Sequence, residues 1–309
     1  MNSFNNIKIL IVGCGQIARV HARILKKLTN NQNIYCFDND KEIQNKFIKE
    51  LNLRPFDKNI FYDGLIVSTP TNKHLSTFKK FFKHANFFFI EKPLVSSLSE
   101  LEKFELVADK NKIYCGFIEL HNDIFEELQK LIGNQDIASI QILRHSPRLK
   151  ADRVTSDAHL DLAIHDVLIL LKYFIKFNEI NVIEIINNYK NGKYFETSEI
   201  ILSDKKINVG ISVSRITNKK IRTWRVVTDK NTYEVDLLNN IINIFASHSK
   251  PTQNSLGFSQ KITNNQLFLK LNEPAENQMV FFLNSINNNK IDKKMQDIIF
   301  NSHSLLLKS

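Results

Sequence analysis

The stretch that decides the fold is IKILIVGCGQIA, residues 7–18, in which an apolar run leads directly into two closely spaced glycines. The run has the length of a buried strand, and helical periodicity follows it. In such a strand–turn–helix unit, Gly13 permits a tight turn, Gly15 lets a pyrophosphate approach the backbone, and Ala18 allows close packing of the helix on the strand. The stretch therefore predicts a dinucleotide-binding loop at a helix N-terminus, where N–H groups and the helix dipole favour an anion.

An acidic residue follows the second apolar run. That run, NIYCF at residues 33–37, is followed directly by Asp38, 25 positions after the first glycine of the loop. A carboxylate at this point accepts hydrogen bonds from the adenosine ribose and repels a 2′-phosphate, so it favours NAD over NADP. Lys41 and Lys46 lie close by in sequence and weaken that exclusion. The alternative is that Asp38 caps a helix that begins near Asp40.

Residues 1–119 alternate apolar runs with amphipathic stretches. Continuous apolar strands separated by helical periods are typical of βαβ units, in which helices cover both faces of a parallel sheet. One expected helix, residues 16–28, has apolar residues on one face, namely Ile17, Val20, Ile24, Leu25 and Leu28. This part therefore predicts a doubly wound, parallel α/β domain of the Rossmann type that binds the dinucleotide. The expected strands are residues 7–12, 33–37, 64–68, 86–90 and 112–117.

Residues 120–309 follow a different rhythm, in which strand-like pieces succeed one another. Strands that follow strands, with a turn at residues 203–205, predict an α+β domain built on a largely antiparallel open sheet. One face of that sheet is expected to lack a covering helix, so we expect a homo-oligomer, a dimer or tetramer, formed through it. We assign substrate binding and oligomerisation to this domain. The expected helices are residues 159–174 and 273–289, and the expected strands are residues 182–187, 194–202, 206–213, 222–228 and 233–237.

The composition is that of a globular protein with a positive charge. The chain has 309 residues, 43% hydrophobic and 24% charged, and a formal net charge of +10. Its lysines are scattered, which argues against nucleic-acid binding, although a positive surface helps to capture an anionic small substrate.

The same composition bears on the compartment. The three cysteines show no metal or disulfide spacing. No apolar run approaches the ~18 residues of a membrane span, and the N-terminus lacks the pattern of a secretory signal. We therefore expect a cytoplasmic protein with a small-molecule substrate and neither a nucleic-acid nor a membrane partner.

Three further segments complete a family pattern. They are STPTNKH at residues 68–74, EKPL at residues 91–94 and DLAIHD at residues 161–166. With the glycine loop they give a sequence that resembles, over its whole length, the glucose–fructose oxidoreductase/inositol dehydrogenase family, Gfo/Idh/MocA. The resemblance implies an NAD(P)-dependent oxidoreductase that acts on CH–OH groups, with NAD favoured here. The cofactor-binding residues that it implies are Gly13, Gly15, Gln16, Ile17, Asp38, Ser68, Thr69, Pro70, Asn72, His74, Glu91 and Lys92.

The residue types fit the oxidation of an alcohol, which needs a base for the hydroxyl proton. His165 is the expected base because an imidazole titrates near pH ~6.5 and can accept a proton at neutral pH. Asp161 lies one helical turn earlier, so its carboxylate can share a face with the imidazole and orient it or bind a neighbouring hydroxyl. Lys92 follows a parallel strand at the edge where ligands gather, and its ammonium can stabilise a developing alkoxide. The alternative for the helical pair is a plain ion pair. No third ligand with convincing spacing supports a metal.

Other segments are similar to the branch of the family that contains UDP-N-acetylglucosamine 3-dehydrogenases. They are RHSPR at residues 144–148, KKIR at residues 219–222 and the helix that begins at Glu273. The similarity implies oxidation at C3 of a UDP-N-acetylhexosamine-type sugar, whose ketone would feed an aminotransferase in surface-polysaccharide synthesis. Leu120 stands where this branch has Arg, so a free polyol, a hexose or a sugar phosphate stays open as the substrate, and so does a non-catalytic NAD-binding role. Forked guanidiniums suit a diphosphate. The expected substrate-binding residues are Lys92, Asn122, Arg144, Arg148, Asp161 and His165.

Overall fold

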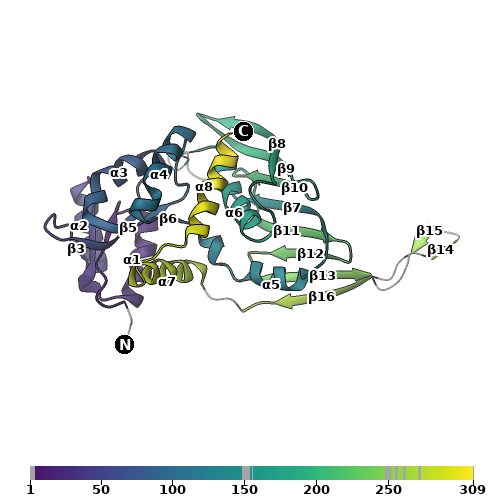
Figure 1. The fold of residues 1–309 in the computed structure, drawn as a ribbon, viewed down its shortest axis with the longest axis horizontal. Coiled ribbons are helices and arrows are strands. Elements are labelled where there is room, and N and C mark those ends of the chain that lie inside the picture. Colours follow the sequence, from purple (N-terminus) through teal and green to yellow (C-terminus); the bar gives the residue numbers. More distant parts are fainter. Residues whose placement is uncertain are drawn as a thin grey trace. The chain divides into compact units, whose positions relative to one another are not determined.

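The computed structural model describes residues 4–147, 154, 156–247, 252–254, 257–259, 262–270 and 273–308. The chain forms two compact units, Met1–His121 with Glu273–Lys308, and Asn122–Asn272, and Figure 1 follows the chain through both.

The first unit is built on a six-stranded parallel sheet with the order β3-β2-β1-β4-β5-β6. This order confirms the expected doubly wound sheet. Its strands are β1 (Ile9–Val12), β2 (Ile34–Phe37), β3 (Arg54–Pro55), β4 (Tyr62–Val67), β5 (Ala85–Glu91) and β6 (Ile113–Gly116). Its first four helices are α1 (Gln16–Leu28), α2 (Lys41–Leu51), α3 (His74–Phe81) and α4 (Leu98–Asn111), with short 3-10 turns at Asn31–Asn33, Thr71–Lys73, Phe82–His84 and Ile118–His121.

Both faces of this sheet are covered. Neighbouring side chains on a strand point to opposite faces, and the aromatic residues of β5 illustrate the result. Phe88 contacts Phe78 of α3 with ring centroids 4.9 Å apart, whereas Phe89 contacts Phe282 at 5.5 Å and His21 of α1 at 5.1 Å. The strand is therefore apolar throughout because each of its faces meets a helical layer.

The buried face of α1 differs in part from the expected one. Ile24 and Leu25 are buried as expected, and so are Ala18 and Ala22, whereas Ile17 and Val20 are each 41% exposed. Small residues let the helix lie close to the sheet, so the alanines face inward and the branched residues near the N-terminus of α1 do not.

The last two helices return to the first unit. They are α7 (Pro274–Asn287) and α8 (Lys293–Leu307), and in α8 Gln296 Nε2 donates a hydrogen bond of 3.0 Å to the Ile113 carbonyl of β6. The expected boundary at residues 119/120 lies next to the change of unit at His121/Asn122, but residues 273–308 pack with the first unit. The assignment of substrate binding and oligomerisation to residues 120–309 stays a prediction.

The second unit is built on an eight-stranded sheet with the order β16-β13-β12-β11-β7-β10-β9-β8. All its neighbouring pairs are antiparallel except β7 and β10, so the expected α+β architecture with a largely antiparallel sheet is confirmed. Its strands are β7 (Ile137–His145), β8 (Asn181–Asn191), β9 (Tyr194–Ser203), β10 (Asn208–Ser214), β11 (Ile221–Thr228), β12 (Asn231–Asp236), β13 (Ile241–Ser247) and β16 (Ile262–Phe268). A separate hairpin joins β14 (Thr252–Asn254) to β15 (Gly257–Ser259).

Helices pack on one face of this sheet. They are α5 (Ile124–Ile132) and the segment expected as a single helix at residues 159–174, which is a π-helical turn, His159–Ala163, followed by α6 (Ile164–Tyr173). Trp224 of β11 is 1% exposed and lies 5.1 Å from the Phe125 ring of α5, at the centre of this core.

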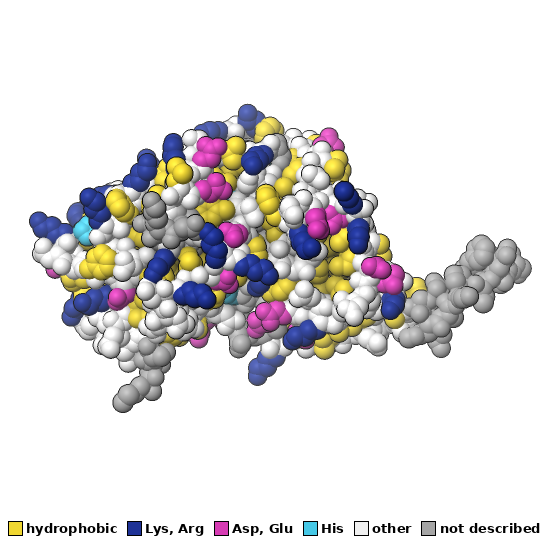
Figure 2. Space-filling view, viewed as in Figure 1, with side chains coloured by type: hydrophobic (Ala, Val, Ile, Leu, Met, Phe, Trp, Pro, Cys, Tyr) yellow, Lys and Arg dark blue, Asp and Glu magenta, His cyan; other side chains and the backbone are white. Residues whose placement is uncertain are grey.

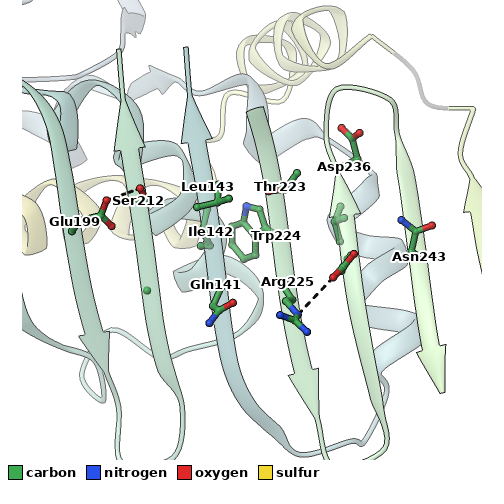
Figure 3. Close-up of a pocket in the computed structure, with 13 residues that line it drawn as sticks. Gln141, Ile142, Leu143, Glu199, Ser212, Thr223, Trp224, Arg225, Asp236 and Asn243 are labelled. Atoms are coloured by element: carbon green, nitrogen blue, oxygen red, sulfur yellow. Dashed lines mark hydrogen bonds and ion pairs between the residues drawn. The ribbon is translucent and has the colours of Figure 1, made fainter. Parts of the chain in front are cut away.

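The opposite face of the sheet carries polar and exposed apolar side chains. Residues from neighbouring strands line a shallow cavity of about 620 Å³ on it, among them Gln141, Leu143 and Arg225. Figure 3 looks onto this face of the sheet.

Two surface properties concern partners. Within the described part of the chain, no helix is long and apolar enough to cross a membrane. Figure 2 shows Lys and Arg side chains spread across the visible face, with Asp and Glu side chains among them.

Candidate functional site

The glycine loop lies at the switch point of the parallel sheet, where β1 pairs with β2 on one side and β4 on the other. Gly13 N donates to Phe37 O of β2, and Ser68 N, just after β4, donates to Val12 O, each at 2.8 Å. Gly13 has φ +94°, and a Cβ there would lie 2.8 Å from the carbonyl carbon and oxygen of Ser68. Only glycine fits this turn. The turn lies at the carboxyl ends of the parallel strands, where ligands of open α/β sheets bind.

The loop fits the pyrophosphate of a dinucleotide. Gly15 is the N-cap residue of α1, and no side chain caps this helix. A Cβ added to Gly15 meets nothing within 4 Å. The protein itself therefore does not require glycine at this position, whereas a bound anion that approaches the helix N-terminus would.

A cavity of about 540 Å³ opens beside the loop. Six expected cofactor residues line it: Gly13, Gly15, Asp38, Ser68, Thr69 and Pro70. Five further lining residues, which sequence reasoning missed, carry polar or charged side chains: Asn39, Lys73, Ser76, Thr77 and Lys80. Lys73, Ser76, Thr77 and Lys80 come from the 3-10 turn and helix after β4, and the helical spacing of Lys73, Thr77 and Lys80 was the available signal.

Asp38 is tied to the loop as well as lining the cavity. Its Oδ2 accepts a 2.8 Å hydrogen bond from Cys14 N, and its Oδ1 accepts one of 3.0 Å from Asp40 N. The N-cap of α2 is Asp40, whose Oδ1 accepts from Glu42 N and Ile43 N. The alternative that Asp38 merely caps this helix is therefore wrong. Its ribose-binding role stays a prediction.

Two lysines lie close to the residue that precedes Asp38. The Nζ of Lys80 lies 4.6 Å from the Phe37 ring centroid, and that of Lys41 lies 5.2 Å from it. Phe37 immediately precedes Asp38. The ammonium groups of Lys41 and Lys80 therefore contact the ring of the residue next to the Asp38 carboxylate. The local charge is therefore mixed, which bears on the choice between NAD and NADP.

The histidine of the STPTNKH segment is structural, which corrects its expected contact with the cofactor. His74 is 1% exposed, and its Nε2 lies 2.8 Å from Thr69 O while its Nδ1 lies 3.2 Å from Leu94 O. Burial lowers the pKa of His74. The imidazole ring of His74 therefore links the loop after β4 to the EKPL segment. Asn72, also expected at the cofactor, is exposed and is not among the residues that line the cavity.

The acid of the EKPL segment also has a partner within the protein. Glu91 Oε1 lies 2.5 Å from Nε2 of the buried His21 of α1, and its Oε2 accepts from Lys92 N at 3.2 Å. The contact with His21 thus accounts for an acidic residue at position 91 without direct contact to the cofactor. His21 is a residue that sequence reasoning did not single out. Lys92 follows β5 directly and is half-buried.

The expected catalytic pair lies in the second unit. Asp161 is in the π-helical turn and His165 in the first turn of α6. The Asp161 side chain is 21% exposed, and His165 is 8% exposed. π-helical turns inside helices are frequent at functional sites.

A buried guanidinium contacts Asp161, and sequence reasoning missed it. Arg215 follows β10 and is 1% exposed; its Nη1 donates to Asp161 Oδ2 at 3.2 Å, and its Nε donates to Glu196 Oε2 at 2.9 Å. Because 54 residues separate Arg215 from Asp161, no local pattern indicates the contact.

Arg144 does not reach a substrate surface, which corrects its expected role in binding phosphate. It is 1% exposed, and it donates from Nε and Nη2 to the two carboxylate oxygens of Asp166, at 2.6 and 2.9 Å. Trp224 Nε1 donates to the same carboxylate at 3.0 Å. This forked pair is a core element of the second unit.

The remaining expected residues divide as follows. Asn122 is 6% exposed, and its Oδ1 accepts from Ile124 N at 3.2 Å at the start of α5, so at least one of its groups has a structural use. Arg148 lies outside the described residues. Among the described residues no cluster of three or more His, Cys, Asp or Glu side chains is arranged to hold a metal ion.

The switch-point glycine loop, the uncapped helix and the acid after β2 define the first unit as a dinucleotide-binding domain. Residues 7–117 match the family model GFO_IDH_MocA, described as an oxidoreductase family with an NAD-binding Rossmann fold. The match covers about a third of the chain and identifies this segment as similar to the NAD-binding domain of the Gfo/Idh/MocA family. The expected cofactor class, a nicotinamide dinucleotide, is confirmed.

Known proteins similar to this chain are dehydrogenases and ketoreductases. A myo-inositol 2-dehydrogenase of Thermotoga maritima is 25% identical over 180 residues, so the match covers 52% of each chain, about half the length of that relative.

Solved structures share the fold over nearly the whole chain. UDP-N-acetylglucosamine 3-dehydrogenase from Acidithiobacillus ferrooxidans has a TM-score of 0.80 at 17% identity and covers 97% of this chain and 95% of its own. A dehydrogenase (MviM) from Clostridium difficile has a TM-score of 0.75 at 21% identity, with 98% of each chain covered. A 3-ketoreductase from Actinomadura kijaniata, solved with NADP and TDP-benzene, has a TM-score of 0.82 at 11% identity and covers 98% of this chain and 96% of its own.

Proposed function

We propose that this chain is an NAD-dependent sugar dehydrogenase that oxidises a ring hydroxyl to a ketone. The observation that carries the proposal is the glycine loop at the switch point, whose uncapped helix N-terminus and open space at Gly15 fit a dinucleotide pyrophosphate. Asp38 beside it favours NAD. When bound, the nicotinamide ring accepts a hydride from the substrate carbon.

The chain's own residues supply the proton chemistry. In this proposal His165 takes the proton of the reacting hydroxyl, because a neutral imidazole is a competent base near neutral pH. The ammonium of Lys92 stabilises the negative charge that develops on the oxygen. Asp161 orients the base or accepts a hydrogen bond from the adjacent hydroxyl.

The substrate that we propose is a UDP-N-acetylhexosamine-type sugar oxidised at C3. The sequence segments shared with the 3-dehydrogenase branch support it, and so does the shared fold. The burial of Arg144 against Asp166 removes one of the two arginines expected to bind the diphosphate. This observation favours the second candidate, a free polyol, hexose or sugar phosphate, and the inositol dehydrogenase relative points the same way.

We also propose that the protein self-associates through the open face of the eight-stranded sheet. The strand register places Ile186, Ile201 and Leu143 on this face, and they are 41%, 42% and 40% exposed. Exposed apolar side chains on one sheet face are typical of an interface. Light scattering of the protein and of Leu143→Arg tests this, because a charge on the face should convert a dimer or tetramer to monomers. A monomer in both samples would contradict it.

A substrate panel tests the proposed function. Purified protein with NAD is mixed with UDP-N-acetylglucosamine, its uronate, myo-inositol or glucose 6-phosphate, and the absorbance of the reduced nicotinamide is followed. Turnover of a UDP-sugar alone supports the first substrate class, and turnover of inositol or the sugar phosphate supports the second. Binding of NAD by titration without turnover of any sugar would favour a non-catalytic NAD-binding protein.

A further inference from the structure

Arg215 makes an unusually complete set of buried hydrogen bonds. Besides its bonds to Asp161 and Glu196, its Nη1 donates to Ser156 O at 2.9 Å and its Nη2 to Phe195 O at 2.8 Å. These acceptors come from β9 and from the segment that leads into the π-helical turn. The guanidinium therefore joins the strand to the chain that carries Asp161.

Stability alone explains this arrangement poorly. Taking charges out of water costs several kcal/mol per ion, and buried ion pairs or triads are often replaced by apolar residues without loss of stability. The pair Arg144–Asp166 in the same unit joins one guanidinium to one carboxylate, with side chains 2% and 1% exposed. Arg215 instead faces two carboxylates, of which Glu196 is 4% exposed and Asp161 is 21% exposed.

We propose that Arg215, anchored by Glu196, is a positioning residue that fixes the carboxylate of Asp161, four residues before His165, and keeps it ionised. The proposal rests on the proposed function for its catalytic meaning. Glu196 shares the guanidinium of Arg215 with Asp161. It therefore weakens the hold of Arg215 on the Asp161 carboxylate, which stays able to accept further hydrogen bonds.

The two partners therefore act on His165 in opposite directions through Asp161. Without Arg215, the two carboxylates lose a cation, and an imidazolium at His165 is better stabilised. Without the charge of Glu196, Arg215 is neutralised by Asp161 alone, and the imidazolium is less stabilised. Among the described residues, the other charged or titratable groups near this segment include Asp157 before the turn, His159 at its start, and the Arg144–Asp166 pair of β7 and α6.

The first measurement does not need a substrate. Imidazole resonances of isotope-labelled protein are titrated with pH by NMR, and the His165 signal is assigned by its absence in His165→Ala. We expect Glu196→Gln to lower the apparent pKa of His165 below that of the wild type. In the double variant Arg215→Met/Glu196→Gln we expect this pKa to be higher than in Glu196→Gln alone. The double variant removes both members of the buried pair, which avoids leaving a lone charge in the core.

Kinetics give the second readout. In the substrate assay we expect Arg215→Lys and the double variant to lower kcat by about tenfold or more with KM changed less than about threefold, because a misplaced catalytic group costs rate rather than binding. Lys130→Met is the matched control, since Lys130 forms an exposed ion pair with Glu127 on α5 of the same unit.

The outcomes separate the two proposals. Opposite shifts of the His165 titration without sugar turnover in the wild type would support the positioning role and contradict the proposed function. Turnover in the wild type with an unshifted His165 titration and unchanged kcat in folded variants would overturn the positioning role alone.

Discussion

The backbone N–H of Cys14 donates a 2.8 Å hydrogen bond to Oδ2 of Asp38, which joins the glycine loop to the acid that follows the second strand. The carboxylate therefore has two tasks: it holds the loop in shape, and it lines the cavity beside that loop. Substitutions of Asp38 are expected to affect these tasks differently.

Asp38→Asn keeps an oxygen that can accept from Cys14 N but removes the charge. We expect it to weaken NADH binding by about tenfold, the value of a hydrogen bond to a charged group, and to improve NADPH binding because repulsion of the 2′-phosphate is lost. Fluorescence titration with NADH and with NADPH measures the ratio of the two dissociation constants. In the Asp38→Asn background, Lys80→Ala should reverse the gain for NADPH, since Lys80 lines the same cavity. Unchanged NADH affinity in Asp38→Asn would show that the carboxylate does not bind the ribose.

The two glycines of the loop predict opposite results on substitution by Ala. Gly13→Ala should destabilise the protein by at least about 2 kcal/mol, because it combines a positive φ with a backbone clash against Ser68. Gly15→Ala should lower stability by no more than about 1 kcal/mol but weaken the binding of NADH by about tenfold or more. Urea unfolding and cofactor titration on both variants check this. A stable Gly13→Ala, or tight NADH binding by Gly15→Ala, would contradict the assigned roles.

Buried histidines predict acid sensitivity of the first unit. His303 of α8 accepts from Leu94 N through Nε2, and its Nδ1 lies 2.7 Å from Ile299 O, so the ring is neutral with its proton on Nδ1. Burial lowers the pKa of His303 to about 4, and that of His74 is lowered for the same reason.

The sign of this effect follows from proton linkage. Between about pH 6.5 and about pH 4 the unfolded chain binds protons at these rings that the folded chain does not, so stability falls as the pH falls, by about 3 kcal/mol for His303 alone. Above about pH 7 the contribution is constant. His303→Gln keeps an acceptor for Leu94 N and should show a smaller loss of stability in urea between about pH 7 and about pH 5 than the wild type. An equal loss in both proteins would contradict the assignment.

The pair Arg144–Asp166 should matter for folding and not for phosphate recognition. Arg144→Met leaves the carboxylate of Asp166 buried without its cation, and we expect a loss of about 3–5 kcal/mol in urea unfolding. Lys130→Met is the control, because Lys130 and Glu127 form an exposed pair on α5, which packs on the face of the sheet opposite the open face, and such surface pairs add little stability. A loss of stability in Arg144→Met no larger than that of the control would contradict the structural role of Arg144 and favour a role in binding substrate.

The sequence made the local features of this fold predictable. The IKILIVGCGQIA stretch contains a strand, a turn and a helix start within 12 neighbouring residues, and its structure follows the expected pattern. The alternating strands of the second unit were recognisable for the same reason, because period-two burial is a local property.

Long-range partners could not be predicted in this way. His21 meets Glu91 across 70 residues, and Arg215 meets Asp161 across 54. These contacts arise from tertiary packing, and a histidine on an amphipathic helix or an arginine after a strand looks like an ordinary surface residue in the sequence. The central parallel pairing of β7 with β10 is likewise a consequence of topology and not of local pattern.

The most direct test of the central claim is hydride transfer from a labelled sugar. UDP-N-acetylglucosamine deuterated at C3 is incubated with the protein and NAD, and the nicotinamide product is analysed by mass spectrometry. Our account predicts deuterated, reduced cofactor with the wild type, and at least about a hundredfold slower formation with His165→Ala and with Lys92→Ala, because general-base catalysis contributes roughly that much. Equal rates of deuterium transfer in the wild type and His165→Ala would contradict the assignment of the base. No transfer from this sugar, from deuterated inositol or from a deuterated hexose or sugar phosphate, with NAD bound, would contradict the dehydrogenase itself.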